Sequence, residues 1–241
     1  MRERRRATDR NRVRIQWAAL RALIPAVLVA GSLPWLTGCT RPPLAELCPK
    51  VLAGELVVSE VRGKQAIADE WGQWLEIYNR RDQPVALGGL RLVLRTLDGA
   101  SFAEIPVRDR ALEIPALGYV VLGGFAQDER PWHVQYGYKL DFDRDIPSQG
   151  FIELSACGAL IDQALYRRVV VGGKDLAGLP DTGTMALDGA RLPDAADNND
   201  DSRWCNDDRA LGVDGGITVP DGGARPFGLP GTPGARNLAC K

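Results

Sequence analysis

Apolar residues recur at every second position in several short runs of this chain. The clearest run is residues 90–94, where single residues separate Leu90, Leu92 and Leu94. A period of two is typical of a β-strand that buries one face. Alternating or short apolar runs predict further strands over residues 56–61, 74–78, 101–105, 119–122, 151–156 and 159–166.

Two dipeptides predict hairpin turns between these strands. Asp98-Gly99 precedes the 101–105 run, and Cys157-Gly158 separates the last two runs. Glycine adopts the positive φ that tight hairpin turns require. From residue 39 onward, no segment of about a dozen residues keeps the helical period of 3.6. The pattern therefore indicates an all-β sandwich or barrel.

The composition changes beyond Tyr166. Residues 172–241 are rich in Gly, Pro, Asp and Asn and contain no long apolar run. We expect one short strand near residues 184–187, followed by loops that packing and disulfides hold in place. The predicted fold is an all-β domain with an irregular C-terminal extension.

The net charge of −1 conceals two parts of opposite charge. Residues 1–38 carry eight Arg against Glu3 and Asp9, whereas the rest of the chain has a net charge of −7. An acidic surplus repels phosphate backbones, so we expect no nucleic-acid partner. The single histidine, His133, excludes sites that need two imidazoles, among them most catalytic zinc and di-iron sites.

The first 38 residues predict a bacterial secretory signal. A basic stretch, residues 1–14, precedes a largely apolar stretch, residues 17–36. Pro25 and Pro34 make this stretch a poor long helix, which argues against a permanent membrane span.

The apolar stretch ends in four residues that resemble the lipobox of bacterial lipoproteins. They are Leu36, Thr37, Gly38 and Cys39. The resemblance implies cleavage before Cys39 and fatty acylation of its thiol, so that a lipid bilayer holds the N-terminus. Thr40, in place of Asp, implies an outer-membrane destination in the cell envelope. The alternative is an ordinary cysteine after an uncleaved anchor.

These observations divide the chain into four parts. They are a signal peptide (1–38), a lipidated tether (39–53), a β-rich core (54–167) and a loop-rich part that completes the domain (168–241).

Four cysteines remain once Cys39 is acylated. In an oxidising compartment they would form two disulfides, for which three pairings exist. We favour Cys205–Cys240, which would fix the irregular C-terminal part, together with Cys48–Cys157. No two cysteines have the spacing of a zinc finger, and we expect no metal and no cofactor.

Several segments, taken in order, resemble the lamin tail domain family. They are ELVVSEV (55–61), QWLEIYN (73–79), VALGGL (85–90), IPALGYVVL (114–122), Asp162 to Tyr166, and GTPGARN (231–237). Asp188 departs from the family pattern, which has a basic residue there. The region around residues 127–149 is longer than the usual loop of the family.

This resemblance implies an immunoglobulin-like β-sandwich without catalytic activity of its own. Bacterial members of the family are commonly exported, and the domain often accompanies hydrolases. The chain has no heptad repeat of the kind that forms rods, so the resemblance does not extend to assembly of a nuclear lamina.

Oxygen-bearing side chains near the C-terminus have the spacing of a calcium loop. Asp197, Asn199, Asp201 and Asp208 would occupy positions 1, 3, 5 and 12. Ser202 replaces the glycine of position 6, and position 12 lacks the usual Glu. We favour the alternative, a solvated loop rich in turns.

Three aspartates suggest a second acidic site. Asp141, Asp143 and Asp145 could supply two carboxylates for acid–base catalysis, but we favour a charged turn. The sequence contains no Gly-x-Ser-x-Gly segment that His133 could serve, and we expect this histidine on a surface or loop. The sequence therefore predicts no catalytic residue.

Aromatic side chains offer a binding hypothesis. Trp74 and Tyr78 share one face of the 74–78 strand, opposite Leu75 and Ile77. Since both faces are apolar, either a ligand or another part of the chain must cover the second face. Trp74, Tyr78 and Trp132 could form a platform for a sugar or a protein. We favour cover by a loop or by the C-terminal part.

The leading functional hypothesis is a non-catalytic, lipid-anchored protein of the cell envelope. Its strand-built domain would act as a structural or protein-interaction module on a tether. The alternative is a carbohydrate- or calcium-dependent binding module that supports adhesion or an exported hydrolase.

Overall fold

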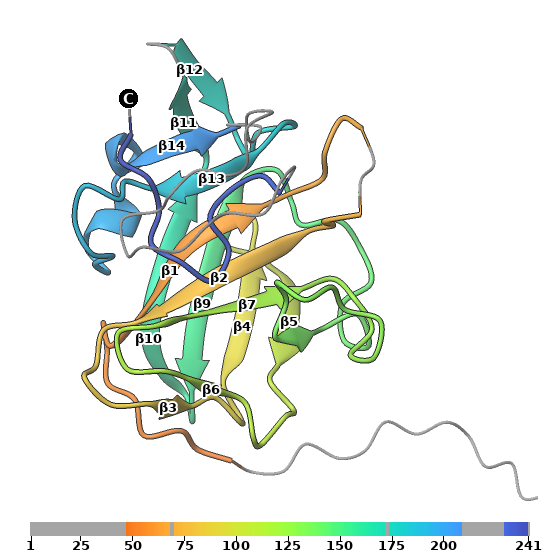
Figure 1. Cartoon of the computed structure of the whole chain (residues 1–241), viewed down its shortest axis with the longest axis vertical. Helices are drawn as coiled ribbons and strands as arrows, with labels where there is room; N and C mark the ends of the chain where they lie inside the picture. The colour runs from red at the N-terminus through yellow and green to blue at the C-terminus, as the bar shows by residue number, and fades with distance from the viewer. Residues whose placement is uncertain (1–46, 68–69, 172–173, 209–228, 241) are drawn as a thin grey trace, which may run out of the picture. The chain divides into compact units, whose positions relative to one another are not determined.

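Two β-sheets face each other across a single apolar core (Figure 1). The computed structural model describes residues 47–67, 70–171, 174–208 and 229–240, which belong to one compact unit, residues 43–241. In this part of the chain the only helices are two 3₁₀ turns, η1 (Asp197–Asn199) and η2 (Asp201–Arg203). The all-β prediction is confirmed. The described residues include no helix of the length and apolarity that a bilayer crossing requires.

The larger sheet has eight strands in the described residues. In spatial order they are β12 (Lys174–Ala177), β11 (Arg168–Val171), β14 (Trp204–Asp207), β13 (Thr184–Leu187), β1 (Leu56–Arg62), β2 (Trp74–Asn79), β7 (Tyr119–Gly123) and β8 (Tyr136–Gly137). The second sheet has the order β10 (Ala159–Tyr166), β9 (Gly150–Ala156), β4 (Arg91–Arg95) and β5 (Ser101–Pro106). A small sheet pairs β3 (Val85–Ala86) with β6 (Glu113–Ile114).

The alternation of apolar and polar residues places the core between the two sheets. In β4, Leu92 and Leu94 are buried, whereas Arg91 is exposed. Leu75 and Ile77 of β2 reach the same core from the larger sheet. Every strand predicted from this pattern occurs, with its ends shifted by at most one residue.

Both predicted hairpins are confirmed. Gly99 has φ 84°, and the Thr96 N–H donates to the Ala100 carbonyl across the turn. Cys157 and Gly158 have φ 51° and 78°, so two consecutive residues with positive φ close the β9–β10 hairpin. This is the backbone of the tight turn that matches the twist of paired strands.

The structure contains both cysteine pairs that the sequence favours. The Cα–Cα distance is 5.6 Å for Cys48–Cys157 and 5.7 Å for Cys205–Cys240, within the range of disulfides. The first pair fixes the start of the described chain to the β9–β10 turn. The second pair fixes the end of the chain to β14.

The C-terminal part is more regular than the sequence predicts. The expected strand is present as β13, but β11, β12 and β14 also join the larger sheet. These three strands have only four residues each, and in two of them, KDLA and WCND, half of the residues are polar. So short a segment shows no measurable period, which is why the prediction of loops was wrong here.

A β-bulge at Ser59 interrupts the alternation in β1. Before the bulge, Leu56 and Val58 point into the core, and after it Val61 does so. One extra residue reverses the face of every later side chain in a strand. The bulge therefore places the carboxylate of Glu60 on the outer face of the sheet, away from the apolar core.

Glu60 lies directly opposite Glu76 of β2, and both side chains are fully buried. Adjacent like charges destabilise a sheet, and buried carboxylates need hydrogen-bond donors. The C-terminal segment, residues 229–240, provides such donors as it crosses the outer face of β1 and β2 (Figure 1). The Thr232 N–H donates to both oxygens of Glu60 at 3.1 and 3.0 Å, and the Gly234 N–H donates to Glu76 at 2.6 Å.

Asn237 fastens the C-terminal segment to two strands at once. Its Nδ2 donates to the Ser59 carbonyl at 2.8 Å and to the Leu187 carbonyl at 2.9 Å. Its Oδ1 accepts from the Thr232 hydroxyl at 2.6 Å. One buried amide thus connects the bulge in β1, the end of β13 and the C-terminal segment.

We expect Asn237→Ala to lower the free energy of unfolding by about 2–3 kcal/mol, because two buried carbonyls lose a donor. Urea denaturation followed by tryptophan fluorescence measures this change. Asn199→Ala is the matched control, since the exposed Asn199 amide bonds only locally to the Ala195 carbonyl, and it should cost less than about 0.5 kcal/mol. Equal effects of the two substitutions would contradict the role assigned to Asn237.

Candidate functional site

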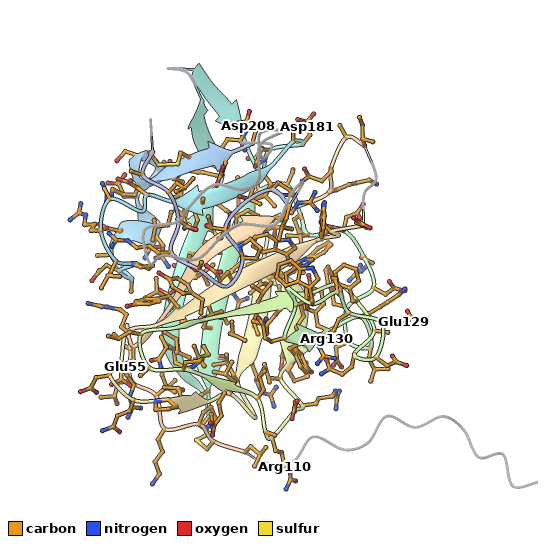
Figure 2. All side chains as sticks on the ribbon, viewed as in Figure 1. Glu55, Arg110, Glu129, Arg130, Asp181 and Asp208 are labelled. Atoms are coloured by element: carbon orange, nitrogen blue, oxygen red, sulfur yellow. A yellow bond between two sulfur atoms is a disulfide. The ribbon has the colours of Figure 1, made fainter. Side chains whose placement is uncertain are left out.

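A cleft of about 360 Å³ lies where β1 ends and β2 begins. One wall is the turn after β1, and the other is the loop between β7 and β9. We call this region the cleft end of the domain. Figure 2 labels Glu129 and Arg130 on the β7–β8 part of that loop, far from Glu55, which precedes β1. The lining side chains include Arg62, Lys64, Gln73, Tyr138, Arg144 and Asp145.

Gln73 and Lys64 hold the two walls of the cleft together. The Gln73 Nε2 donates to Asp145 at 2.8 Å, and its Oε1 accepts from the Ile146 N–H at 2.8 Å. The Lys64 ammonium lies 2.9 Å from Asp145. The hydrogen bond from Lys64 lowers the pKa of Asp145, and the same contact raises the pKa of Lys64. Because this pair is largely exposed, it positions the wall more than it stabilises the fold.

Aromatic rings form the apolar part of the cleft. The Arg144 guanidinium lies 4.7 Å from the centroid of Phe102 and 5.7 Å from that of Phe142, in cation–π geometry. Tyr138 is buried beside Phe142, and this burial raises the pKa of its hydroxyl. The cleft thus combines ring surfaces with cations, carboxylates and amides. Such a mixture suits a polar ligand with an apolar face.

His133 is buried among tryptophans in the loop between β7 and β8. Its ring lies 5.6 Å from Trp71, 6.4 Å from Trp74 and 5.5 Å from Trp132, each edge to face. Its Nε2 is 3.3 Å from the Trp71 carbonyl. His133 therefore lies in a loop, which was one of the two positions expected, but it is buried and not at the surface.

The predicted aromatic platform is only partly exposed. Trp74 and Tyr78 are buried, so neither offers a ring face to solvent. Trp74 packs with Val121, Val134 and Phe125, and Tyr78 packs on Tyr119 at 4.8 Å. We expected other parts of the chain to cover the second face of this strand, and for Trp74 and Tyr78 they do. Trp132 is different, with 63% of its surface exposed at the cleft end.

The three aspartates of the 141–145 segment have separate surroundings. Arg108 binds Asp141 through two hydrogen bonds, at 2.9 and 2.7 Å, and this contact raises the pKa of Arg108. Asp145 belongs to the cleft wall, and Asp143 is exposed beside it. Asp141 also borders a second, more apolar hollow of about 630 Å³, together with the exposed Leu140. This segment is a charged turn that separates two hollows.

Arginines occupy the carboxylates of the predicted calcium loop. Asp197 lies 3.3 Å from Arg191 and 3.5 Å from Arg203, and Asp201 lies 2.8 Å from Arg167. The Asn199 amide bonds to the local backbone. Within the described ranges, no three Asp, Glu, His or Cys side chains converge as metal ligands. The loop therefore presents ion pairs where a calcium site would need free oxygens.

Asn198, which the sequence did not single out, docks this loop on the sheets. Its Nδ2 donates to Asp162 Oδ2 at 2.7 Å, and the Val58 N–H donates to the same oxygen at 2.8 Å. Asp162 is buried, and desolvation raises its pKa to about 6 in spite of these donors. One carboxylate thus links β1, β10 and η1.

The lipobox residues Leu36, Thr37, Gly38 and Cys39 lie outside the described residues. Sequence reasoning missed Arg62, Lys64, Gln73 and Arg144 in the cleft. The one available signal was position, because Arg62 and Lys64 follow the strand predicted over 56–61 and Gln73 precedes the one predicted over 74–78. Nothing in the spacing of these residues shows that the fold brings them together.

Comparisons with protein-family models, with curated proteins and with solved structures gave no match to this chain. The function must therefore be argued from the geometry of the chain itself.

The buried carboxylate of Asp162 should make stability fall as the pH rises. Its pKa is about 6 in the folded protein and 3.8 in a model peptide, so the folded state binds more protons between these values. Below about pH 4 the carboxyl group is protonated in the folded protein and does not lower the free energy of unfolding. Above pH 6 it is ionised and lowers that free energy by about 3 kcal/mol. We expect Asp162→Asn to remove this component, measured as the difference between variant and parent in urea denaturation at the two pH values.

Asp98→Asn is the control for this pH dependence. Hydrogen bonds from Thr96 and Ala100 lower the pKa of the exposed Asp98, so its contribution has the opposite sign. A decline from acid to neutral pH that is the same in the parent and in Asp162→Asn would show that Asp162 does not titrate as described.

Proposed function

We propose that this chain is a non-catalytic, lipid-anchored protein of the cell envelope whose β-domain acts as an interaction module. Fatty acylation of Cys39 would hold it on a bilayer, most simply that of the outer membrane. The domain itself is proposed to be an immunoglobulin-like sandwich of the lamin tail kind. The ligand or partner would bind at the cleft end.

The position of the cleft relative to the tether is the observation that carries this proposal. The described chain begins at residue 47 and reaches β1 at Leu56, whereas the cleft includes Arg62 at the other end of that strand. A strand of seven residues spans about 20 Å. An anchor before residue 47 would therefore join the domain at the end of β1 opposite the cleft, so that the attachment itself leaves the cleft accessible to a partner.

Two features support the lamin tail proposal. Two sheets share one core, as in an immunoglobulin-like sandwich. The GTPGARN segment also has a structural reason: a Cβ at Gly231 would come within 2.2 Å of Glu60, while Thr232 and Asn237 bond to the outer face of the sheet. Gly231, Thr232 and Asn237 of the segment that resembles the lamin tail family thus each have a structural role that depends on the residue type.

We expect Cys39→Ala to block acylation and to leave an uncleaved precursor, because the thiol is the group that receives the lipid. Intact-mass spectrometry of protein purified from a bacterial membrane fraction measures both effects. Thr40→Ala keeps the thiol and should be processed like the parent. A Cys39→Ala protein that is shortened and membrane-bound like the parent would rule out the anchor.

A second candidate function is carbohydrate binding at the cleft end. The exposed indole of Trp132 favours it, since sugar rings stack on exposed aromatic faces, and the nearby cleft supplies amides, carboxylates and cations for hydroxyl groups.

If the cleft end binds a glycan, Trp132→Ala should weaken that binding about tenfold or more. A glycan array followed by titration calorimetry of any hit measures the change. Leu192→Ala, which shortens another exposed apolar side chain outside the cleft, should bind like the parent. Binding that survives both substitutions, or no hit at all, would count against the carbohydrate hypothesis.

A further inference from the structure

Four turns meet at the end of the domain opposite the cleft. They are residues 47–55, 79–83, 115–118 and 157–160, and we call this surface the tether end. Three leucines there are exposed: Leu52 by 71%, Leu117 by 53% and Leu160 by 53%. Figure 2 labels Glu55 on this surface. Single exposed leucines are ordinary, but these three lie on turns at the same end of the domain and so could meet one apolar environment together.

Hydrogen bonds hold these turns in fixed positions. The Gly54 N–H donates to the Ile161 carbonyl at 2.7 Å, and the Leu117 N–H donates to the Arg81 carbonyl at 2.9 Å. Arg81 Nη1 in turn donates to the Lys50 carbonyl at 3.0 Å. The Cys48–Cys157 disulfide joins the first turn to the last. The three leucines therefore belong to one rigid surface.

Leu117 shows that this exposure has a conformational cost. Its φ is 53°, in the left-handed region that glycine or asparagine normally occupies. A branched apolar residue at such a position is strained. Because the Leu117 side chain is largely exposed, its packing in the core does not offset this strain. The leucine at this turn tip is thus better explained by a contact outside the domain than by the fold.

The charges of the tether end balance. Arg80 pairs with Asp194 at 2.9 Å, and Arg81 lies 3.7 Å from Glu55. Of the other ionisable side chains on these turns, Lys50 and Asp82 are exposed and opposite in sign. A surface without net charge is neither attracted to anionic lipids nor repelled by them.

The length of the chain before the described residues decides what can reach this surface. Eight residue steps separate Cys39 from Leu47, which span at most about 28 Å when fully extended. Both Leu47 and the adjacent Cys48 belong to the tether end. An acyl chain on Cys39 would therefore keep this surface close to the bilayer, with the cleft end farther out by the length of β1.

We infer that the tether end rests on the lipid surface, with Leu52, Leu117 and Leu160 inserted among the head groups. This inference depends on the proposed acylation of Cys39 and adds a second, non-covalent contact to it. The occupant is a zwitterionic lipid surface, since balanced charges need no anionic lipid. The contact fixes the direction of the cleft, because a rigid domain that touches the bilayer through three turns cannot tumble on its tether.

The test uses the full, acylated protein in phosphatidylcholine vesicles that contain nitroxide-labelled lipids. Leu117→Cys, labelled with an environment-sensitive fluorophore, should be quenched by the nitroxides about twofold or more above the control. The control is Leu97→Cys, an exposed leucine on the β4–β5 turn at the other end of the domain, with 46% of its surface exposed. Adding salt should leave the quenching unchanged.

Flotation of the same vesicles separates this inference from the anchor. If the protein floats and the Leu117 label is no more quenched than the Leu97 label, the anchor stands and the lipid contact is wrong. If the Leu97 label is quenched as strongly as the Leu117 label, the domain lies flat and the inferred orientation is wrong. A protein that does not float overturns both proposals. Leu52→Asp combined with Leu160→Asp should lower the quenching at Leu117 without releasing the protein.

Discussion

Two carboxylates buried side by side on the outer face of β1 and β2 impose the condition that organises this domain. Glu60 and Glu76 face each other across the strand pair, where repulsion and desolvation both oppose burial. They are tolerated because backbone N–H groups of Thr232 and Gly234 point at them. The sheet therefore needs the C-terminal segment, and the C-terminal segment has its position because the carboxylates are there.

The same condition explains why β1 and β2 are buried on both sides. Their inner residues meet the second sheet, and their outer residues lie under the C-terminal segment and the loops around Trp74 and Tyr78. With the middle of the sheet closed on both faces, recognition is left to the two ends of the strands. One end carries the cleft, and the other carries the exposed leucines.

The sequence predicted those features that depend on a few consecutive residues. The strand at 90–94 and the Cys157-Gly158 turn follow from period and turn chemistry within a few residues, and both are present. The cleft could not be predicted, because Gln73 and Asp145 meet only through the fold. The bulge at Ser59 was also invisible, since LVVSEV supports an unbroken strand as well as an interrupted one. Burial of Trp74 depends on chain that lies far away in sequence.

The order in which the parts are made has a consequence for folding. The strand at the centre of the larger sheet is the first of the described strands to be synthesised, yet Ser59 receives its cover from Asn237, 178 residues later. Contacts of such long range form slowly, because a long loop must close before they contribute. Until residues 229–240 leave the ribosome, Glu60 and Glu76 lack the backbone N–H donors of Thr232 and Gly234 and keep donors from the sheet, such as the hydroxyls of Thr184 and Ser59. Closure of the outer face of β1 and β2 therefore waits until residues 229–240 have been synthesised.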